Sequence, residues 1–302
     1  MAEEVSVLGE ALGAAGAVPE IVRGMGRAIQ SADRSIYYFF GYFQGNWALD
    51  RIASQLESDT LLKTGPVISL LWYFWFRSDG DPYERRTTIL TILTGTFLGL
   101  VVTRLLATLT PFRTRPIYEA GLVHHAFSMP MPSYFSQMSS FPSDHAAYLA
   151  ALGFGLIYLS RRLTAPVIAF VALWICLPRV YMGIHYASDI VAGCLIGIAA
   201  VWGCERTQWV RNVVARPLLA FMDAKPQVFY AVAFVITFEL GTMFLDVREL
   251  SRALLHVLSV GRYGEATELL LFGVLCVIAY SLWRHHGLSK ARPIGQRLQS
   301  KY

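Results

Sequence analysis

The sequence predicts an all-α membrane protein, a polytopic helical bundle of about seven transmembrane helices with an interfacial N-terminal helix. Of the 302 residues, 55% are hydrophobic and 16% are charged, and the mean hydropathy is +0.44. Because a soluble domain carries roughly 25% charged residues, much of this surface is expected to avoid water. Several apolar runs also approach the roughly 20 residues that a helix needs to cross a bilayer.

The N-terminal segment is interpreted as polar and then interfacial. Residues 1–35 are small and polar, whereas residues 36–60 mix aromatic side chains with Asp50, Arg51 and Glu57. Aromatic rings favour the headgroup level of a membrane. The second stretch is therefore predicted to form a helix at the membrane interface.

Seven apolar segments follow and are predicted to be transmembrane helices. They cover residues 61–77, 87–110, 144–160, 163–182, 187–203, 227–245 and 266–283. We expect three parts along the chain. They are a polar and interfacial segment over residues 1–60, a core bundle over 61–205, and two additional transmembrane helices with a basic tail over 206–302.

Lys and Arg residues predict the orientation, because cytoplasmic loops of membrane proteins are enriched in them. With seven helices, the loops and tail on one side hold fourteen Lys and Arg, against five in the loops of the other side. The N-terminal segment adds five to that second side, which is predicted to face the exterior. No basic stripe interleaved with aromatic residues accompanies the net charge of +5, so no nucleic-acid partner is expected.

Three stretches place ionisable residues where membrane helices should be apolar. The first contains Arg104, Arg113 and Arg115, and the others occupy residues 141–145 and 178–189. Ionisable groups at membrane depth are costly and usually functional. The first stretch ends the second predicted helix, the second begins the third helix, and the third joins the fourth helix to the fifth. In an up-down bundle all three stretches therefore fall on the same face.

The residue types in these stretches suit phosphate chemistry. His185 and Asp189 are four residues apart, a spacing that places both on one face of a helix. A carboxylate on one ring nitrogen fixes the tautomer and leaves the other nitrogen free to attack. Arg179 and the arginines of the first stretch offer planar forks for phosphate oxygens. Ser143 adds a neutral donor where a helix begins, and His145 is a candidate general acid.

Plainer structural roles remain open for several of these residues. His185 with Asp189 could form a structural helix pair, and His145 could be a satisfied histidine at a helix start. Arg104 could extend its charge to the membrane interface, and one of Arg113 and Arg115 is expected to be an interface anchor.

These stretches resemble the three motifs of the type 2 phosphatidic acid phosphatases, within the acid phosphatase and vanadium haloperoxidase superfamily. The resemblance covers residues 36–205 and centres on Pro-Ser-x-His at 142–145 and Arg-x5-His-x3-Asp at 179–189. The Pro-Ser-Asp-His form is most similar to bacterial undecaprenyl pyrophosphate phosphatases.

The resemblance implies a role for each motif residue. His185 would be the nucleophile that forms a phosphohistidine, Asp189 would orient it, and His145 would be the general acid. Ser143, Arg179 and the arginines of the first motif would hold the phosphate. The resemblance implies no metal and no organic cofactor.

All three motifs depart from the family pattern, and the third has Pro178 where Ser is common. The first motif is Lys-x6-Arg-Pro in the family, and Arg104 is expected to replace its lysine. Pro111 is expected to break the helix and bring Arg113 or Arg115 back toward Arg104, and which of the two binds phosphate is open. Asp144 stands where the family has Gly. It is expected either to cap the helix or to tune the site as an extra carboxylate.

The expected function is a membrane lipid phosphatase that hydrolyses undecaprenyl pyrophosphate, another polyprenyl diphosphate or a related lipid phosphate. It is expected in a bacterial inner membrane, with its site facing the periplasm or exterior. Alternatives are a lipid phosphotransferase with the same phosphohistidine chemistry and a phosphatidic acid or phosphatidylglycerol phosphate phosphatase. A binding or lipid-translocating protein that kept the fold, and a haloperoxidase, are further alternatives. The expected partner is a membrane lipid, and a homo-oligomer is compatible with the sequence.

Overall fold

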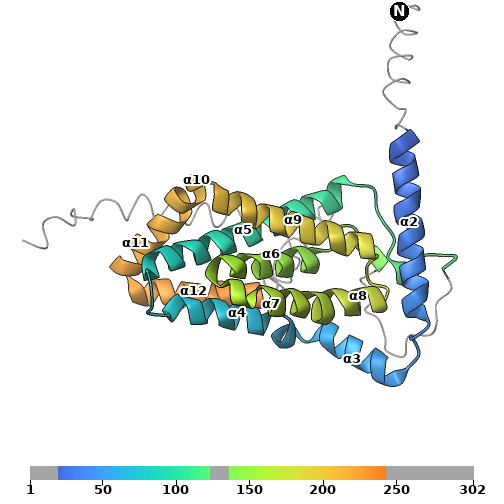
Figure 1. The fold of residues 1–302 in the computed structure, drawn as a ribbon, viewed down its shortest axis with the longest axis horizontal. Coiled ribbons are helices and arrows are strands. Elements are labelled where there is room, and N and C mark those ends of the chain that lie inside the picture. The colour runs from blue at the N-terminus through green and yellow to red at the C-terminus, as the bar shows by residue number, and fades with distance from the viewer. Residues whose placement is uncertain (1–19, 123–135, 243–302) are drawn as a thin grey trace, which may run out of the picture. The chain divides into compact units, whose positions relative to one another are not determined.

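The computed structural model describes residues 20–122 and 136–242, and all secondary structure within them is helical (Figure 1). The all-α prediction is therefore confirmed for these residues. They belong to two compact units, which meet in the chain between Ala220 and Phe221. The predicted helix at 266–283 and most of the basic tail lie outside the described residues.

The first unit holds the core helices in chain order. They are α2 (Glu20–Gly41), α3 (Trp47–Ser58), α4 (Thr60–Phe76), α5 (Pro82–Leu109), η1 (Pro116–Tyr118), α6 (Asp144–Leu159), η3 (Arg161–Leu163), α7 (Thr164–Phe170), η4 (Val171–Cys176), α8 (Leu177–Tyr181), α9 (Ala187–Arg206), α10 (Gln208–Val210) and η5 (Arg211–Ala215). Helix α11 (Arg216–Ala224) crosses the boundary, and α12 (Pro226–Gly241) lies in the second unit.

Three described helices are long and apolar enough to cross a membrane. They are Pro82–Leu109, the combined helix Arg161–Tyr181, and Ala187–Arg206. Two shorter apolar helices, Asp144–Leu159 and Pro226–Gly241, fall below that length. The predicted number of seven transmembrane helices is therefore not confirmed.

The N-terminal segment is more helical than its composition indicates. Helix α2 begins at Glu20, inside the stretch predicted to be polar, and a short turn separates it from α3. Gly45 in that turn adopts a φ of 85°, which an L side chain rarely accepts. The Asn46 side chain then accepts hydrogen bonds from the backbone N–H groups of Ala48 and Leu49 and so caps α3. The predicted single interfacial helix is thus split between two helices.

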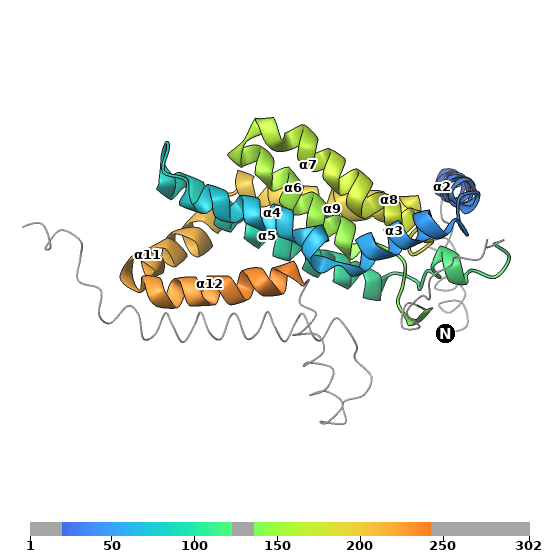
Figure 2. The ribbon, with the colours of Figure 1, turned by 90° about the horizontal axis from the view of Figure 1, so that it is seen from below.

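Helices α5, α6 and α9 pack against one another as the core of the first unit, as both views show (Figure 2). Glycines of α9 allow the closest contact. A Cβ atom on Gly193 would lie 2.2 Å from the Ser143 carbonyl oxygen, and one on Gly197 would lie 2.0 Å from that of Ala147. Because no side chain fits there, the backbone of α9 rests directly on the start of α6. This contact brings the second and third motif stretches together.

The fourth predicted helix, 163–182, is present but irregular. Its middle, Val171–Cys176, is a π-helix that ends just before Pro178. Proline has no N–H to donate and disturbs the helix ladder, and π segments often occur near functional sites. After α8, Gly183 turns the chain with a φ of 68°. The backbone N–H of His185 then donates back to the Arg179 carbonyl at 3.3 Å, so this histidine is held against the end of α8.

Helix α2 runs across one end of the first unit, beside the end of α8 and the start of α9 (Figure 1). Figure 2 shows the same helix nearly end-on at that place. The C-terminal end of α5 and the N-terminal end of α6 also lie toward this end. The three motif stretches therefore converge where α2 crosses.

Candidate active site

The three charged stretches meet through backbone hydrogen bonds. The Ser140 N–H donates to the Arg113 carbonyl at 2.8 Å, which joins the first stretch to the second. The Ser143 N–H donates to the Asp189 carbonyl at 3.1 Å, which joins the second stretch to the third. The prediction that these stretches share one face of the bundle is confirmed for the described residues.

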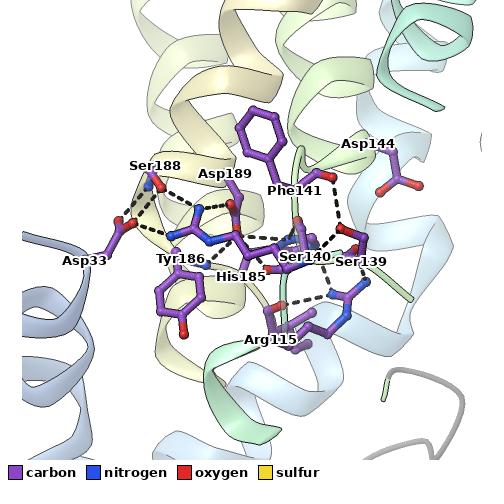
Figure 3. Close-up of polar contacts among 12 residues, drawn as sticks. Asp33, Arg115, Ser139, Ser140, Phe141, Asp144, His185, Tyr186, Ser188 and Asp189 are labelled. Carbon is purple, nitrogen blue, oxygen red and sulfur yellow. Dashed lines mark hydrogen bonds and ion pairs between the residues drawn. The ribbon is translucent and has the colours of Figure 1, made fainter. Parts of the chain in front are cut away.

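His185 lies at the centre of this cluster, and its side chain is only 4% exposed. Its Nδ1 lies 2.8 Å from the Ser140 carbonyl oxygen (Figure 3). Because a carbonyl oxygen only accepts, Nδ1 carries the hydrogen and Nε2 carries the lone pair. Arg115 Nη1 lies 3.3 Å from that Nε2 and also donates to the Ile184 carbonyl at 2.9 Å. The unprotonated nitrogen of the ring therefore faces a guanidinium group.

Asp189 acts on His185 through Ser140 rather than directly. The carboxylate oxygen Oδ2 is 3.9 Å from His185 Nδ1, which is beyond hydrogen-bond distance. Instead, Oδ2 accepts from Ser140 Oγ at 2.5 Å and from the Tyr186 N–H at 2.9 Å. Ser140 thus contacts the histidine with its carbonyl and the carboxylate with its hydroxyl. The i,i+4 spacing brings the pair close, and Ser140 lies between them.

The surroundings of His185 favour its neutral form. Burial lowers the pKa of the imidazole, and the cationic Arg115 and Arg179 lower it further, while Asp189 opposes them. A neutral ring keeps its Nε2 lone pair. Both the hydrogen-bond geometry and the lowered pKa therefore indicate that the His185 ring can act as a nucleophile near neutral pH.

The two arginines of the first motif have different partners. Arg113 forms an ion pair with Asp189, a second with Asp33 at 2.7 Å, and a hydrogen bond to Ser188 Oγ at 2.8 Å. Its guanidinium carbon also lies 4.2 Å from the ring centre of Tyr186. Since carboxylates occupy both ends of its fork, Arg113 is a poor candidate for phosphate. Arg115, whose Nη1 lies beside His185 Nε2, is the better one.

Asp144 connects the remaining residues of the first two motifs. One of its oxygens forms an ion pair with Arg104. The other accepts from the His145 backbone N–H at 2.9 Å and lies 3.2 Å from His145 Nδ1. Ser143 holds the N-cap position of α6, so Asp144 is the first residue of the helix rather than its cap. Of the two predicted roles, the structure favours the extra carboxylate of the site.

Arg179 and Ser143 are completely enclosed, with 1% and 0% of each residue exposed. The Arg179 Nη2 group pairs with the Glu57 carboxylate of α3 at 2.7 Å. Arg179 Nε and Ser143 Oγ have no hydrogen-bond partner among the described residues. A buried donor left unpaired costs about 1–3 kcal/mol, so such atoms indicate a place for a polar ligand.

Glu57 is the counter-ion of this buried arginine. Burial alone raises the pKa of the Glu57 carboxyl, but the cations Arg179 and Lys63 outweigh it and hold the pKa below 4.5. The carboxylate therefore stays ionised. Lys63, which is itself buried, also acts electrostatically on His145. The charge of Arg179 is thus paired with a carboxylate before any substrate phosphate enters the site.

Sequence reasoning missed four residues of this network. Ser140 and Ser188 lie beside the motifs, in Ser-Ser-Phe-Pro and Tyr-Ala-Ser-Asp, and their nearness to the motifs was a usable signal. Asp33 and Glu57 lie in α2 and α3, and each belongs to an amphipathic helix with no local pattern that marks it. Among the described residues, no group of three or more His, Cys, Asp or Glu could hold a metal ion.

Residues 87–212 match the family model of the PAP2 superfamily. The chain therefore carries a PAP2 superfamily domain. This region includes all three motif stretches, from Arg104 to Asp189. It excludes α2, α3 and α4, which precede it.

Relatives of known name match parts of the chain at low identity. The undecaprenyl-diphosphatase BcrC of Bacillus subtilis is 25% identical over 158 residues, which is 52% of this chain and 74% of that protein. The lipid A 1-phosphatase of Rhizobium johnstonii is 32% identical over 108 residues, 34% of this chain and 41% of that protein. A solved PAP2-type phosphatidylglycerolphosphate phosphatase from Bacillus subtilis is 22% identical, with a TM-score of 0.36, and the match covers 59% of this chain and 85% of that one.

Proposed function

We propose that this protein is an integral membrane lipid phosphatase that hydrolyses a polyprenyl diphosphate, such as undecaprenyl diphosphate, through a phosphohistidine on His185. The observation that carries the proposal is the state of His185. Its Nδ1 hydrogen is held by the Ser140 carbonyl, and its Nε2 faces the Arg115 guanidinium. A nucleophile with a fixed tautomer beside a phosphate-binding cation is what phosphoryl transfer to histidine needs.

The first chemical step is attack of His185 Nε2 on the terminal phosphorus. The bond between that phosphorus and the bridging oxygen breaks, and the shortened lipid phosphate leaves with the electron pair. His145 gives a proton to the leaving oxygen, while Asp144 holds the other nitrogen of its ring. Arg115, Arg179 and the Ser143 hydroxyl bind the oxygens of the transferred phosphoryl group.

The second step returns the enzyme to its starting state. A water molecule attacks the phosphorus of the phosphohistidine, and His145 accepts a proton from that water. The N–P bond breaks, inorganic phosphate leaves, and His185 Nε2 recovers its lone pair. No group outside this chain, the lipid and water takes part in the proposed steps.

The lipid substrate and the membrane location are proposed together. The apolar helices α5, Arg161–Tyr181 and α9 support a membrane location, and the BcrC relative supports undecaprenyl diphosphate. The lipid A 1-phosphatase relative supports the wider class of lipid phosphates. The Lys and Arg distribution favours a site on the extracytoplasmic face of a bacterial inner membrane. The course of α2 across the bundle end suits a helix at that interface.

The test follows phosphate release by purified protein in detergent. Undecaprenyl diphosphate, lipid A, phosphatidic acid and phosphatidylglycerol phosphate are compared, with EDTA present and with His185→Ala alongside. We expect release from undecaprenyl diphosphate to be fastest and to fall at least about 10,000-fold in the variant, because the nucleophile is lost. The exposed substitution Asp79→Asn serves as the activity control, and unfolding midpoints verify that each variant is folded.

A chemical signature tests the intermediate separately. After rapid quenching with phosphorus-32 substrate, a phosphohistidine keeps its label in alkali and loses it in acid. We expect such a label in the wild type and none in His185→Ala. Activity or label that persists in a folded His185→Ala protein would exclude the proposed nucleophile. Label without phosphate release until an alcohol is added would instead assign a phosphotransferase.

A further inference from the structure

Asp33 of α2 is a buried carboxylate outside the PAP2 superfamily domain that contacts the candidate site. The residue is 3% exposed. Its oxygens accept from Arg113 Nη2 at 2.7 Å, from the Ser188 backbone N–H at 2.9 Å, and from Ser188 Oγ at 2.6 Å. Ser188 is the second residue of α9, so Asp33 satisfies one of the N–H groups that a helix start leaves unpaired.

These contacts continue as a chain of hydrogen bonds to the nucleophile (Figure 3). Asp33 holds Arg113, and Arg113 pairs with Asp189. Asp189 accepts from Ser140 Oγ, and the Ser140 carbonyl accepts from His185 Nδ1. Each link is a polar group that must be satisfied once buried. A change at Asp33 therefore reaches His185 through Arg113 and Asp189.

The charges along this chain of hydrogen bonds indicate what Asp33 does. Arg113 lies between two carboxylates, Asp33 and Asp189, and is shared by them. Without the Asp33 charge, Arg113 would be drawn fully to Asp189 and would compete with Ser140 for that carboxylate. The start of α9 would also lose the acceptor of its Ser188 N–H. Both changes loosen the register between the second and third motifs.

We propose that Asp33 is a positioning residue of the phosphatase site, so that α2 is a functional part of the enzyme as well as an interfacial helix. This inference rests on the proposed function, because the position that Asp33 maintains is that of the nucleophile His185. Among the described residues, the hydrogen bonds of Asp33 go to Arg113 and Ser188 rather than to His185, and Asp33 is not expected to touch the substrate. Its effect should appear in the chemical step rather than in lipid binding.

The experiment compares Asp33→Asn, Arg113→Gln and the double variant in the detergent assay with undecaprenyl diphosphate. Asp33→Asn preserves the shape of the side chain and removes its charge. We expect kcat to fall about tenfold to 100-fold, since small displacements of a reacting group cost this much, while KM changes less than about twofold. Asp79→Asn makes the same chemical change at an exposed residue and should leave both constants unchanged.

The double variant tests the route. If Asp33 acts through Arg113, adding Asp33→Asn to Arg113→Gln should lower kcat by less than about twofold more, so the two effects are not additive. Fully additive effects would overturn the inference, as would an unchanged kcat in folded Asp33→Asn. A rise in KM with kcat unchanged would assign Asp33 to substrate binding and would also overturn it.

Failure of the proposed function would be recognised separately. If the wild-type protein forms no phosphohistidine, the proposed function is excluded. The positioning role is then decided by the rate at which diethyl pyrocarbonate modifies His185, measured by mass spectrometry. Faster modification in Asp33→Asn than in Asp79→Asn would support the role, and equal rates would overturn it.

Discussion

The two histidines of the site are held in different ways. The ring of His185 is buried and donates to a backbone carbonyl, and its acidic partner Asp189 stands behind Ser140. The ring of His145 is 26% exposed and lies beside the Asp144 carboxylate itself, which also pairs with Arg104. A carbonyl fixes the tautomer without adding charge, whereas a carboxylate can also stabilise a positive charge on the ring. The first arrangement suits a nucleophile. In the second, burial and Arg179 lower the pKa of the His145 imidazole while Asp144 opposes them, which favours release of a proton to a leaving oxygen.

The largest expected effect concerns His145, and it tests the role that this comparison gives to its ring. His145→Gln should slow phosphate release from undecaprenyl diphosphate about 1,000-fold, because the leaving oxygen loses its proton donor. An aryl phosphate, whose leaving group needs no proton, should be affected far less. Initial rates with both substrates measure the difference. Equal losses for the two substrates would remove His145 from the role of general acid.

Asp144→Asn should have a smaller effect than loss of the ring. The ring of His145 would remain but would lose the carboxylate that holds its Nδ1 hydrogen, and Arg104 would lose its ion-pair partner. We expect kcat to fall roughly 100-fold through misplacement of the ring. The double variant with His145→Gln should lose little more than His145→Gln alone. Additive losses would mean that Asp144 has a separate task.

The smallest effect is expected from Ser140→Ala. This variant keeps the backbone carbonyl that binds His185 and removes only the hydroxyl that donates to Asp189. A lost hydrogen bond of about 1 kcal/mol corresponds to a rate loss of about fivefold. A loss as large as that of His145→Gln would show that the hydroxyl, rather than the carbonyl, governs the nucleophile.

The pH profiles of the wild type and of Ser140→Ala test the environment of His185 further. His185 must be neutral to attack, so kcat/KM should fall as pH drops through its pKa. Because burial lowers that pKa, the acid limb should lie below the ordinary value of 6.5 in the wild type. Ser140→Ala should leave this limb where it is, since the carbonyl contact and the burial are unchanged. A wild-type limb above 6.5 would contradict the assigned environment of His185.

Local patterns in the sequence were sufficient for the residues of the motifs themselves. Charged residues at the ends of apolar segments predicted that the three stretches share one face, and the backbone pairs of Ser140 with Arg113 and of Ser143 with Asp189 confirm it. The end of α5 at Leu109, just before Pro111, follows from the lack of a proline N–H. These features depend on residues close together in the chain.

Contacts between helices that are far apart in the chain could not be predicted from the sequence. Asp33 and Glu57 contact residues more than 80 positions away at Ser188 and Arg179, and an isolated acidic residue in an amphipathic helix carries no mark of its partner. The choice between Arg113 and Arg115 also depended on which guanidinium the fold places beside His185. The apolar runs indicated the predicted segments, but they did not show that α2 begins at Glu20 or that residues 171–176 form a π-helix.

The position of Asp33 has a consequence for how the protein is made. Its partners Arg113 and Ser188 lie 80 and 155 residues later in the chain. Helix α2 leaves the ribosome long before either of them, so its carboxylate lacks its full set of partners until the start of α9 has been synthesised. The site can therefore be completed only after the start of α9 has been synthesised. Phosphatase activity would then report that synthesis has reached α9, and a nascent chain stopped before α9 should be inactive.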